Sequence, residues 1–106
     1  MTTETSTPFV SIVIPAKDEQ EYIARCLNAV IGQDYPKDKM EIIVVDNNST
    51  DDTKKIALQY KDIKVLSTKG TISSVRNLGG KESKGEFIAF CDQDDLWLPE
   101  KLSKQL

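Results

Sequence analysis

Three acidic side chains crowd into four positions near the C-terminal end of the 106-residue chain, at Asp92, Asp94 and Asp95. They follow a short apolar run, so they stand where a buried strand would end. Carboxylates this close repel one another unless a positive charge joins them, and a divalent cation with oxygen ligands is one such charge. Asp92 and Asp94 are the expected metal ligands, and Asp95 is expected to cap the next helix. A solvated acidic turn is the alternative that the spacing leaves open.

Another acid, Asp46, also ends an apolar run, and the turn-forming segment 47–52 follows it. The polar residues at alternate positions from Asp46 onward resemble the start of an EF-hand calcium loop. The sixth position of such a loop would be Asp51 instead of Gly and the twelfth Ala57 instead of Glu, which rules it out. Asp46 keeps two interpretations: an acceptor of hydrogen bonds from a nucleobase or ribose, or a plain turn acid.

The chain lacks the glycine-rich loops that usually bind phosphate: neither GxGxxG nor GxxxxGK[ST] follows the first apolar run, where Lys17 and Glu19 stand. The charge of a diphosphate would then have to be met by a metal and by Lys or Arg. Arg76, followed by Asn77, is the best candidate because a guanidinium presents a fixed fork of donors, and Lys69 is the next. A solvated helix face is the alternative for Arg76. Zinc is disfavoured, because the chain has no His and no paired Cys ligands.

Four apolar runs and the helical patterns between them must position these side chains. Strands are expected at residues 9–14, 40–46, 63–66 and 87–91, and helices between Asp18 and Gly32, after the turn as far as Tyr60, from Gly70 to Lys84 and after Pro99. The alternation predicts a Rossmann-like α/β fold, with a four-stranded parallel sheet and helices on both faces. Parallel strands share one carboxyl edge, so segments 15–19, 46–49 and 92–95 are expected to build one cleft.

Single residues set the expected boundaries and burial. Pro15 is expected to end the first strand, and Asp18 to cap the first helix. The inward stripe of that helix is formed by apolar residues at helical spacing: Tyr22, Ile23, Cys26, Leu27, Val30 and Ile31. The fourth strand is continuously apolar and is expected to be buried on both faces. Trp97 is expected to pack against the sheet edge rather than form a pocket wall.

The composition is that of one soluble globular domain, with 29% charged and 39% apolar residues. We expect a flexible lead-in over residues 1–8 and a domain over residues 9–106. The net charge of −3 argues against nucleic-acid binding. No signal peptide or membrane span is recognisable, and reduced thiols at Cys26 and Cys91 are expected rather than a disulfide, which fits a cytoplasmic location.

Four segments, in the same order and at similar spacing over residues 9–104, resemble the nucleotide-binding half of family 2 glycosyltransferases. They read VSIVIPAKDEQEYIARCL, EIIVVDNNSTDDT, ISSVRNLG and KGEFIAFCDQDDLWLPEKL. Each motif is weak alone, but the four in sequence are specific. The resemblance implies the A-type glycosyltransferase fold, a nucleotide-diphospho-sugar-binding fold that here is truncated after the Asp-x-Asp strand.

What the resemblance implies for the site can be stated position by position. The nucleotide-sugar-binding residues would be Pro15, Ala16, Lys17, Glu19, Asp46, Asn48, Arg76, Asn77 and Asp92. Asp46 would bond the base, and Arg76 would lie beside the sugar phosphates. Asp92 and Asp94, in Asp92-Gln93-Asp94, would hold Mn²⁺ or Mg²⁺ against the donor diphosphate, and Asp94→Ala would abolish metal-dependent binding without unfolding the chain.

The implied reaction is transfer of a sugar from a nucleotide-diphosphate-sugar donor, UDP-linked, to an acceptor that the sequence does not identify: a sugar, a lipid-linked sugar or a protein. A general base is expected beyond Leu106, in an enzyme that can be membrane-associated, so this chain would be the donor-binding half. We also expect self-association through an exposed sheet edge.

Two alternatives come from other classes. One is a phosphotransferase of the haloacid dehalogenase type, with Asp92 as nucleophile and Asp94 as acid; that family places its Asp-x-Asp after the first strand. The other is a non-catalytic binding module. Saturable binding of a nucleoside diphosphate with Mn²⁺ would distinguish the donor-binding half from an inert module.

Overall fold

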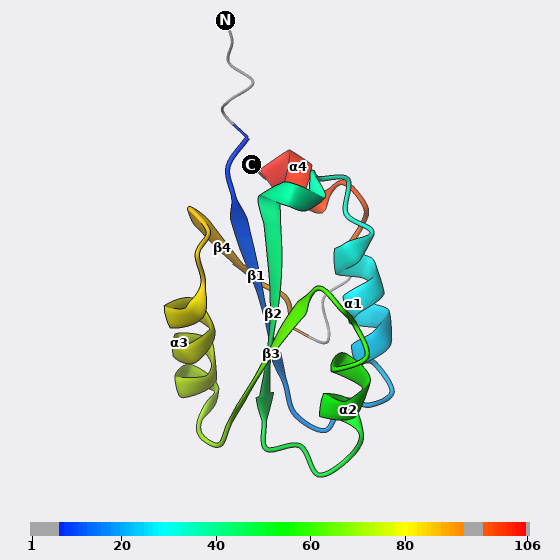
Figure 1. The fold of residues 1–106 in the computed structure, drawn as a ribbon, viewed down its shortest axis with the longest axis vertical. Helices are drawn as coiled ribbons and strands as arrows, with labels where there is room; N and C mark the ends of the chain where they lie inside the picture. The colour runs from blue at the N-terminus through cyan, green and yellow to red at the C-terminus, as the bar shows by residue number, and fades with distance from the viewer. Residues whose placement is uncertain (1–6, 93–96, 106) are drawn as a thin grey trace, which may run out of the picture.

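The computed structural model describes residues 7–92 and 97–105, which form one parallel sheet covered by helices. The strands are β1 (Val10–Ala16), β2 (Met40–Asn47), β3 (Ile63–Thr68) and β4 (Phe87–Phe90). They lie in the order β3-β2-β1-β4, and every neighbouring pair is parallel (Figure 1). The predicted four-stranded parallel sheet is therefore confirmed.

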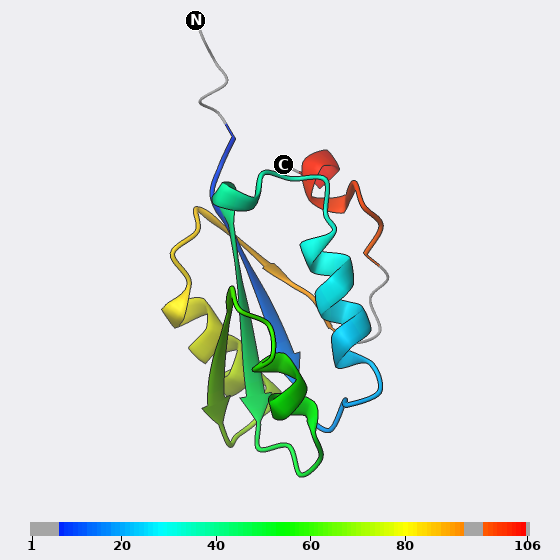
Figure 2. The ribbon, with the colours of Figure 1, turned by 45° about the vertical axis from the view of Figure 1, so that its right-hand side comes forward.

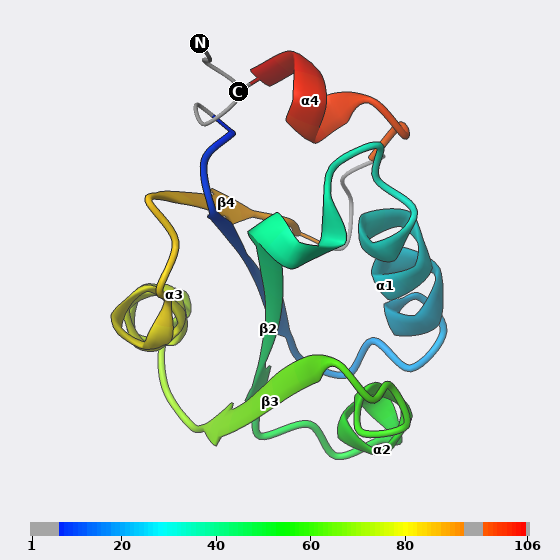
Figure 3. The ribbon, with the colours of Figure 1, turned by 45° about the horizontal axis from the view of Figure 1, so that its top comes forward.

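Helices lie on both faces of the sheet, as predicted. The helices are α1 (Ile23–Ile31), α2 (Thr53–Ala57), α3 (Ile72–Glu82) and α4 (Lys101–Gln105), with a short 3₁₀ turn, η2 (Lys37–Lys39), before β2. Figure 3 shows α3 on one face of the sheet and α1 and α2 on the other. Among the described residues, no helix has the length and apolar character needed to cross a bilayer.

The core is split in two by the sheet, because successive side chains of a strand point to opposite faces. Ile12, Ile14 and Val44 join the cluster under α1 and α2, whereas Val13 and Ile43 join the smaller cluster under α3. All five are at most 1% exposed. Burial on both faces explains why these strands read as continuous apolar runs.

The first strand runs through Pro15 instead of ending there. The carbonyl of Val13 accepts a hydrogen bond from the amide of Cys91, so Val13 faces β4, and Pro15, two residues on, faces the same side. The pairing of β1 with β4 ends at Phe90, opposite Val13. The missing N–H of Pro15 thus falls beyond the ladder, which is why the strand tolerates it.

Helix α1 also departs from the prediction at its ends. Its N-cap residue is Tyr22, which makes no side-chain cap, and Asp18 does not cap the helix. The middle of the predicted stripe is buried, with Ile23 and Leu27 at most 1% exposed, but Tyr22 and Ile31 are 47% and 36% exposed. The prediction was wrong for those two because they lie at the two ends of the helix, beyond the turns that pack on the sheet.

Three other boundaries shift. The helix that was expected to reach Tyr60 ends at Ala57, and the third strand continues to Thr68. Helix α3 runs to Glu82 without a break at Gly79. A Cβ on Gly79 would collide with Cγ1 of Val13, so this glycine allows close approach of α3 to β1.

The fourth strand is an edge strand, and the prediction that it is buried on both faces was wrong. Its only neighbour in the described sheet is β1. Phe87, Ile88 and Phe90 are 51%, 43% and 39% exposed. An apolar run reports a preference for burial, but it cannot report whether a second neighbour is present.

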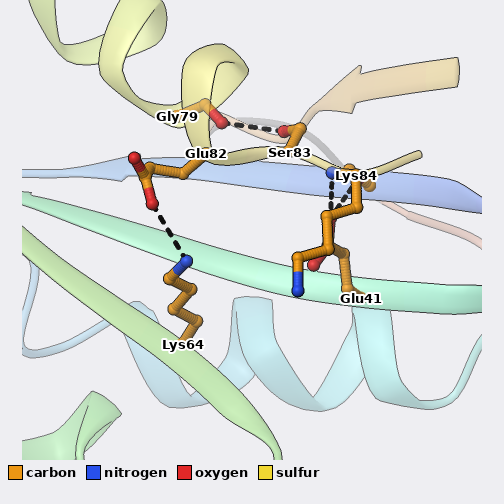
Figure 4. A network of polar contacts seen from close by, with 7 residues as sticks. Glu41, Lys64, Gly79, Glu82, Ser83 and Lys84 are labelled. Atoms are coloured by element: carbon orange, nitrogen blue, oxygen red, sulfur yellow. Dashed lines mark hydrogen bonds and ion pairs between the residues drawn. The ribbon is translucent and has the colours of Figure 1, made fainter. Parts of the chain in front are cut away.

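The end of α3 is fixed to the sheet where the chain turns into β4 (Figure 4). Lys64 Nζ on β3 lies 3.1 Å from Glu82 Oε1, and the hydroxyl of Ser83 donates to the carbonyl of Gly79 at 2.7 Å. The ion pair is about 40% exposed, so it contributes about 0–1 kcal/mol and mainly sets orientation.

A polar junction around the buried Ser11 continues this connection. Glu41 Oε2 on β2 accepts from the hydroxyl of Ser11 at 2.5 Å and from the backbone amide of Lys84 at 2.6 Å. The hydroxyl of Ser11, which is fully buried, in turn accepts from the amide of Gly85 at 2.8 Å. A Cβ on Gly85 would lie 2.5 Å from the backbone nitrogen of Ser11, so only glycine fits. Together these bonds fix the start of β4, the strand that leads to Asp92.

Candidate functional site

A cleft of about 310 Å³ opens at the carboxyl edge of the sheet. Figure 2 shows β2 and β3 ending at this edge, where the chain turns toward α2 and α3. The residues that line the cleft are Pro15, Ala16, Lys17, Glu19, Asn47, Ile72, Val75, Arg76 and Asp92. They come from the end of β1 and the loop that follows it, from the end of β2, from the first half of α3 and from the segment after β4. The predicted convergence is confirmed for residues of segments 15–19 and 46–49 and for Asp92, whereas residues 93–95 lie outside the described residues.

Six predicted binding residues line this cleft: Pro15, Ala16, Lys17, Glu19, Arg76 and Asp92. Asp46, Asn48 and Asn77 do not line it, and the last two are exposed. Sequence reasoning missed Asn47, Ile72 and Val75. Val75 is both fully buried and part of the cleft wall.

The charged centre of the cleft is a bond between Arg76 on α3 and Asp92 after β4. Nη2 of Arg76 donates to both carboxylate oxygens of Asp92, at 3.2 and 3.0 Å. The two side chains are 42% and 45% exposed, so solvent reaches the pair. The guanidinium lies 5.6 Å from the ring centre of Phe90, and its Nε is buried without a hydrogen-bond partner among the described residues. The guanidinium therefore has one N–H, at Nε, that no described residue binds.

Asp46 is a buried acceptor at the end of β2. Its residue is 3% exposed, and its strand position pairs with Ala16, which lines the cleft. Oδ2 accepts from the amide of Ser49 at 3.2 Å, whereas Oδ1 is buried and has no partner in the described part of the chain. Buried acceptors are nearly always satisfied, so Oδ1 is an acceptor whose partner is not among the described residues, although Asp46 itself does not line the cleft.

Asn47 connects two walls of the cleft. Its Nδ2 donates to the carbonyl of Gly70 at 2.9 Å, and its Oδ1 accepts from the amide of Gly70 at 3.0 Å. The end of β2 is thereby joined to the turn before α3, whose N-cap residue Thr71 accepts from the amide of Ser74. The signal in the sequence was an Asn at a strand end, since its amide group can bond a backbone N–H and C=O together.

The loops after β1 and β2 are bonded to each other. The amide of Asp18 donates to the hydroxyl of Ser49 at 2.9 Å, and Oδ1 of Asp18 accepts from the amide of Thr50 at 2.7 Å. This contact replaces the helix cap that was predicted for Asp18. Both Asp18 and Asn48 have φ of 52°, a left-handed conformation that Asp and Asn adopt more readily than most residues.

Further along, the same two loops exchange three more bonds. The amide of Glu19 donates to Thr53 Oγ1 at 2.7 Å, and the amide of Gln20 donates to Asp51 Oδ2 at 3.2 Å. In return, the amide of Asp52 donates to Gln20 Oε1 at 3.1 Å. The cleft segment that holds Glu19 is therefore fixed by the loop that starts α2.

Asp51 is the described acid of this loop whose titration is shifted. The hydroxyl of Thr53 donates to Oδ1 of Asp51, and the amide of Thr53 donates to the same atom at 2.9 Å. The hydroxyl bond stabilises the carboxylate and lowers the pKa of Asp51 below its ordinary value, with smaller contributions from backbone amides.

The metal prediction rests only partly on described residues. Asp94, like Gln93 and Asp95, lies outside them. Within residues 7–92 and 97–105, no group of three His, Cys, Asp or Glu side chains could hold an ion. Asp92 does place a carboxylate at the cleft, and Mg²⁺ is usually held by one or two carboxylates together with substrate phosphates and water. The donor chemistry of Asp92 therefore fits a hard divalent cation.

Residues 11–106 match the family described as Glycosyl transferase family 2. Among curated proteins, the chain is 47% identical over 94 residues to glycosyltransferase AglE of Haloferax volcanii, which covers 82% of this chain and 31% of AglE. The chain thus spans about a third of the length of that relative.

Solved structures give the same result. The structure of Staphylococcus aureus TarS residues 1–349 in complex with UDP-GlcNAc superposes with a TM-score of 0.83 at 35% identity, over 91% of this chain and 29% of TarS 1–349. Mannosyltransferase PcManGT of Pyrobaculum calidifontis, in complex with GDP-Man and Mn²⁺, superposes with a TM-score of 0.80 at 29% identity, over 93% of this chain and 31% of that one.

Proposed function

Since the chain belongs to glycosyl transferase family 2, we propose that its cleft binds a nucleotide-diphosphate sugar, which the whole enzyme transfers to an acceptor. The observation that carries the proposal is the meeting of Lys17, Arg76 and Asp92 in one cleft at the carboxyl edge of a parallel sheet. Ligands bind at this edge in open α/β sheets, and the two cations suit a diphosphate.

Different residues of the cleft bind different parts of the donor. Arg76 and Lys17 attract the diphosphate, and the fork of Arg76 contacts its oxygens through the donors that Asp92 leaves unused. Asp46 Oδ1 accepts an N–H of the base. Pro15 and Ala16 form the apolar wall between these polar ends.

A divalent cation, Mn²⁺ or Mg²⁺, belongs to the proposal, and Asp92 with Asp94 would hold it. When bound, such a cation neutralises the charge that develops on the departing nucleoside diphosphate. Asp92 would then be shared between the cation and Arg76, whose guanidinium would lie beside the diphosphate in the same cleft. The Mn²⁺ in the related mannosyltransferase supports this assignment.

We propose UDP as the nucleotide. The uracil ring has an imide N–H that matches one unsatisfied carboxylate oxygen, and the relative TarS binds UDP-GlcNAc. Guanine presents two adjacent N–H donors to a carboxylate, whereas Asp46 has one oxygen without a partner among the described residues, Oδ1, and its Oδ2 already accepts from the amide of Ser49. The chain spans about a third of the length of AglE, and we assign it neither an acceptor site nor a general base.

The test is calorimetric titration of UDP with and without Mn²⁺. Mn²⁺ should tighten UDP binding by about tenfold or more, or about 1.4 kcal/mol. Asp92→Asn, and likewise Asp94→Ala, should remove this gain while circular dichroism stays unchanged. Asp62→Asn, an exposed acid before β3, is the matched control and should bind like the unaltered chain. Absence of saturable UDP binding, or an unchanged Mn²⁺ effect in Asp92→Asn, would contradict the proposal.

The haloacid dehalogenase alternative gains no support. Its Asp-x-Asp follows the first strand of the chain, whereas Asp92 follows β4, the fourth strand. Asp92 is also bonded through both oxygens to Arg76, which makes it a poor nucleophile for a phosphoryl group. Release of phosphate from a phosphate monoester by the unaltered chain, lost in Asp92→Asn, would reverse this judgement.

A further inference from the structure

Two thiols distant in sequence lie in contact beneath α1. Sγ of Cys26, on α1, is 3.4 Å from Sγ of Cys91, which follows β4. Cys91 is 1% exposed, whereas Cys26 is partly exposed. Both belong to or pack against the larger apolar cluster. Neither takes part in the cleft, so the proposed function does not explain the contact.

The backbones on both sides of the contact are fixed. The amide of Cys26 donates to the carbonyl of Tyr22 at 2.9 Å within α1, and the amide of Cys91 donates to the carbonyl of Val13 at 3.0 Å. A disulfide needs its sulfur atoms about 2.05 Å apart, so these atoms must approach by about 1.4 Å. Because the backbones are hydrogen-bonded, this approach falls to rotation of the two side chains.

We propose that Cys26 and Cys91 form a redox modification site, which a low-molecular-weight disulfide converts to an intramolecular disulfide. The more accessible Cys26 thiolate attacks one sulfur of the oxidant, and one thiolate leaves. The Cys91 thiolate then attacks Sγ of Cys26, and the second thiolate leaves. The protein gives up two protons and two electrons, and the oxidant is reduced to two thiols.

The new bond would join α1 to the residue directly before Asp92. It would also close a loop that contains β2, α2, β3, α3 and β4, and cross-links across long loops constrain the unfolded chain most. The oxidised protein should therefore unfold at a higher temperature than the reduced protein, and a reductant should reverse the difference.

The experiment measures the equilibrium of the folded chain with reduced and oxidised glutathione, by intact mass after acid quenching. The same measurement in concentrated urea gives the value for two thiols in an unfolded chain. Because folding holds the sulfur atoms in contact, the equilibrium constant in native buffer should exceed that in urea by at least about tenfold. An equal or smaller constant in native buffer would overturn the proposal.

Two variants resolve the order of the steps. Cys91→Ser should stop at a mixed disulfide of Cys26 with glutathione, and Cys26→Ser should stay unmodified in native buffer because Cys91 is buried. A stable mixed disulfide on Cys26 in the unaltered chain, or retention of both thiols, would overturn the proposal. The comparison with urea needs no variant, so it holds even if a serine variant fails to fold.

Discussion

Arg76 contacts both oxygens of Asp92 and still has a buried Nε without a described partner. The pair is nearly half exposed, so its own contribution to stability is small, about 0–1 kcal/mol. Its importance lies in placing a cation and a carboxylate side by side at the cleft. A ligand that brings both an anion and a cation can bind Arg76 through the anion and Asp92 through the cation.

Replacing Arg76 by Gln should weaken UDP binding far more than it weakens the fold. Loss of a charge-assisted hydrogen bond costs about 1.5–3 kcal/mol, which is about tenfold or more in affinity. Lys81→Gln, an exposed cation on the same helix, is the control for net charge and should leave affinity unchanged. Calorimetry and urea unfolding measure the two effects, and equal UDP affinity in both variants would contradict the role of Arg76.

Asp51 gives the folded state a dependence on acid. Because its pKa is lowered by Thr53, Asp51 binds protons less readily in the folded than in the unfolded chain. Its contribution to stability is therefore present above the ordinary pKa of 3.8 and is lost as the pH falls through the lower folded value. Urea unfolding of the unaltered chain and of Asp51→Asn should differ near neutral pH and converge in acid. If the free energies of unfolding of the two proteins differed by the same amount from neutral to acidic pH, the role of Asp51 would be refuted.

Helix α3 carries Arg76 and is positioned by its close approach to β1. The approach depends on Gly79, because a Cβ there would collide with Val13. A Cβ on Gly80 would meet no atom within 4 Å. The same helix thus has two neighbouring glycines, of which only Gly80 has room for a side chain.

Gly79→Ala should destabilise the protein by about 1–3 kcal/mol through overpacking. Gly80→Ala should instead stabilise it by about 0.5–1 kcal/mol, because Ala loses less backbone entropy in a helix. Urea unfolding of both variants measures the difference. If the two substitutions shift the midpoint in the same direction, α3 does not lie as close to β1 as described.

Periodicity predicted the strands and helices because β1 and β2 are buried on both faces and α1 on one. It could not predict that β1 continues through Pro15, since that depends on where the neighbouring β4 ends. It also misassigned Asp18, whose partner Thr50 lies in another loop and is invisible to local capping rules. Asn47 was missed for the same reason, because its partner Gly70 is distant in sequence.

The molecule has an exposed apolar edge at β4. Helix α4 buries Leu102, but it leaves Phe87, Ile88 and Phe90 exposed. An apolar edge strand with one unpaired side is a template for pairing with another strand. Helix α4 therefore does not cover the apolar edge of β4, and self-association through this edge is still expected.

The 106-residue chain should form dimers or larger species through β4 as its concentration rises. Ile88→Lys should shift it toward the monomer, since a charge on an edge strand opposes pairing. Leu58→Lys, at an exposed apolar residue after α2, is the matched control and should associate like the unaltered chain. Light scattering over a concentration series measures the mass, and a monomer at every concentration would contradict the prediction.

The bonds between the loops after β1 and β2 have a consequence for protein engineering. Side chains of each loop bind the backbone of the other: Asp18 Oδ1 accepts from the amide of Thr50, and the hydroxyl of Ser49 accepts from the amide of Asp18. Grafting residues 17–22 from a relative would remove partners that residues 47–53 require, and the reverse graft would do the same. The two segments therefore depend on each other. Chimeras meant to alter nucleotide binding should replace both segments together.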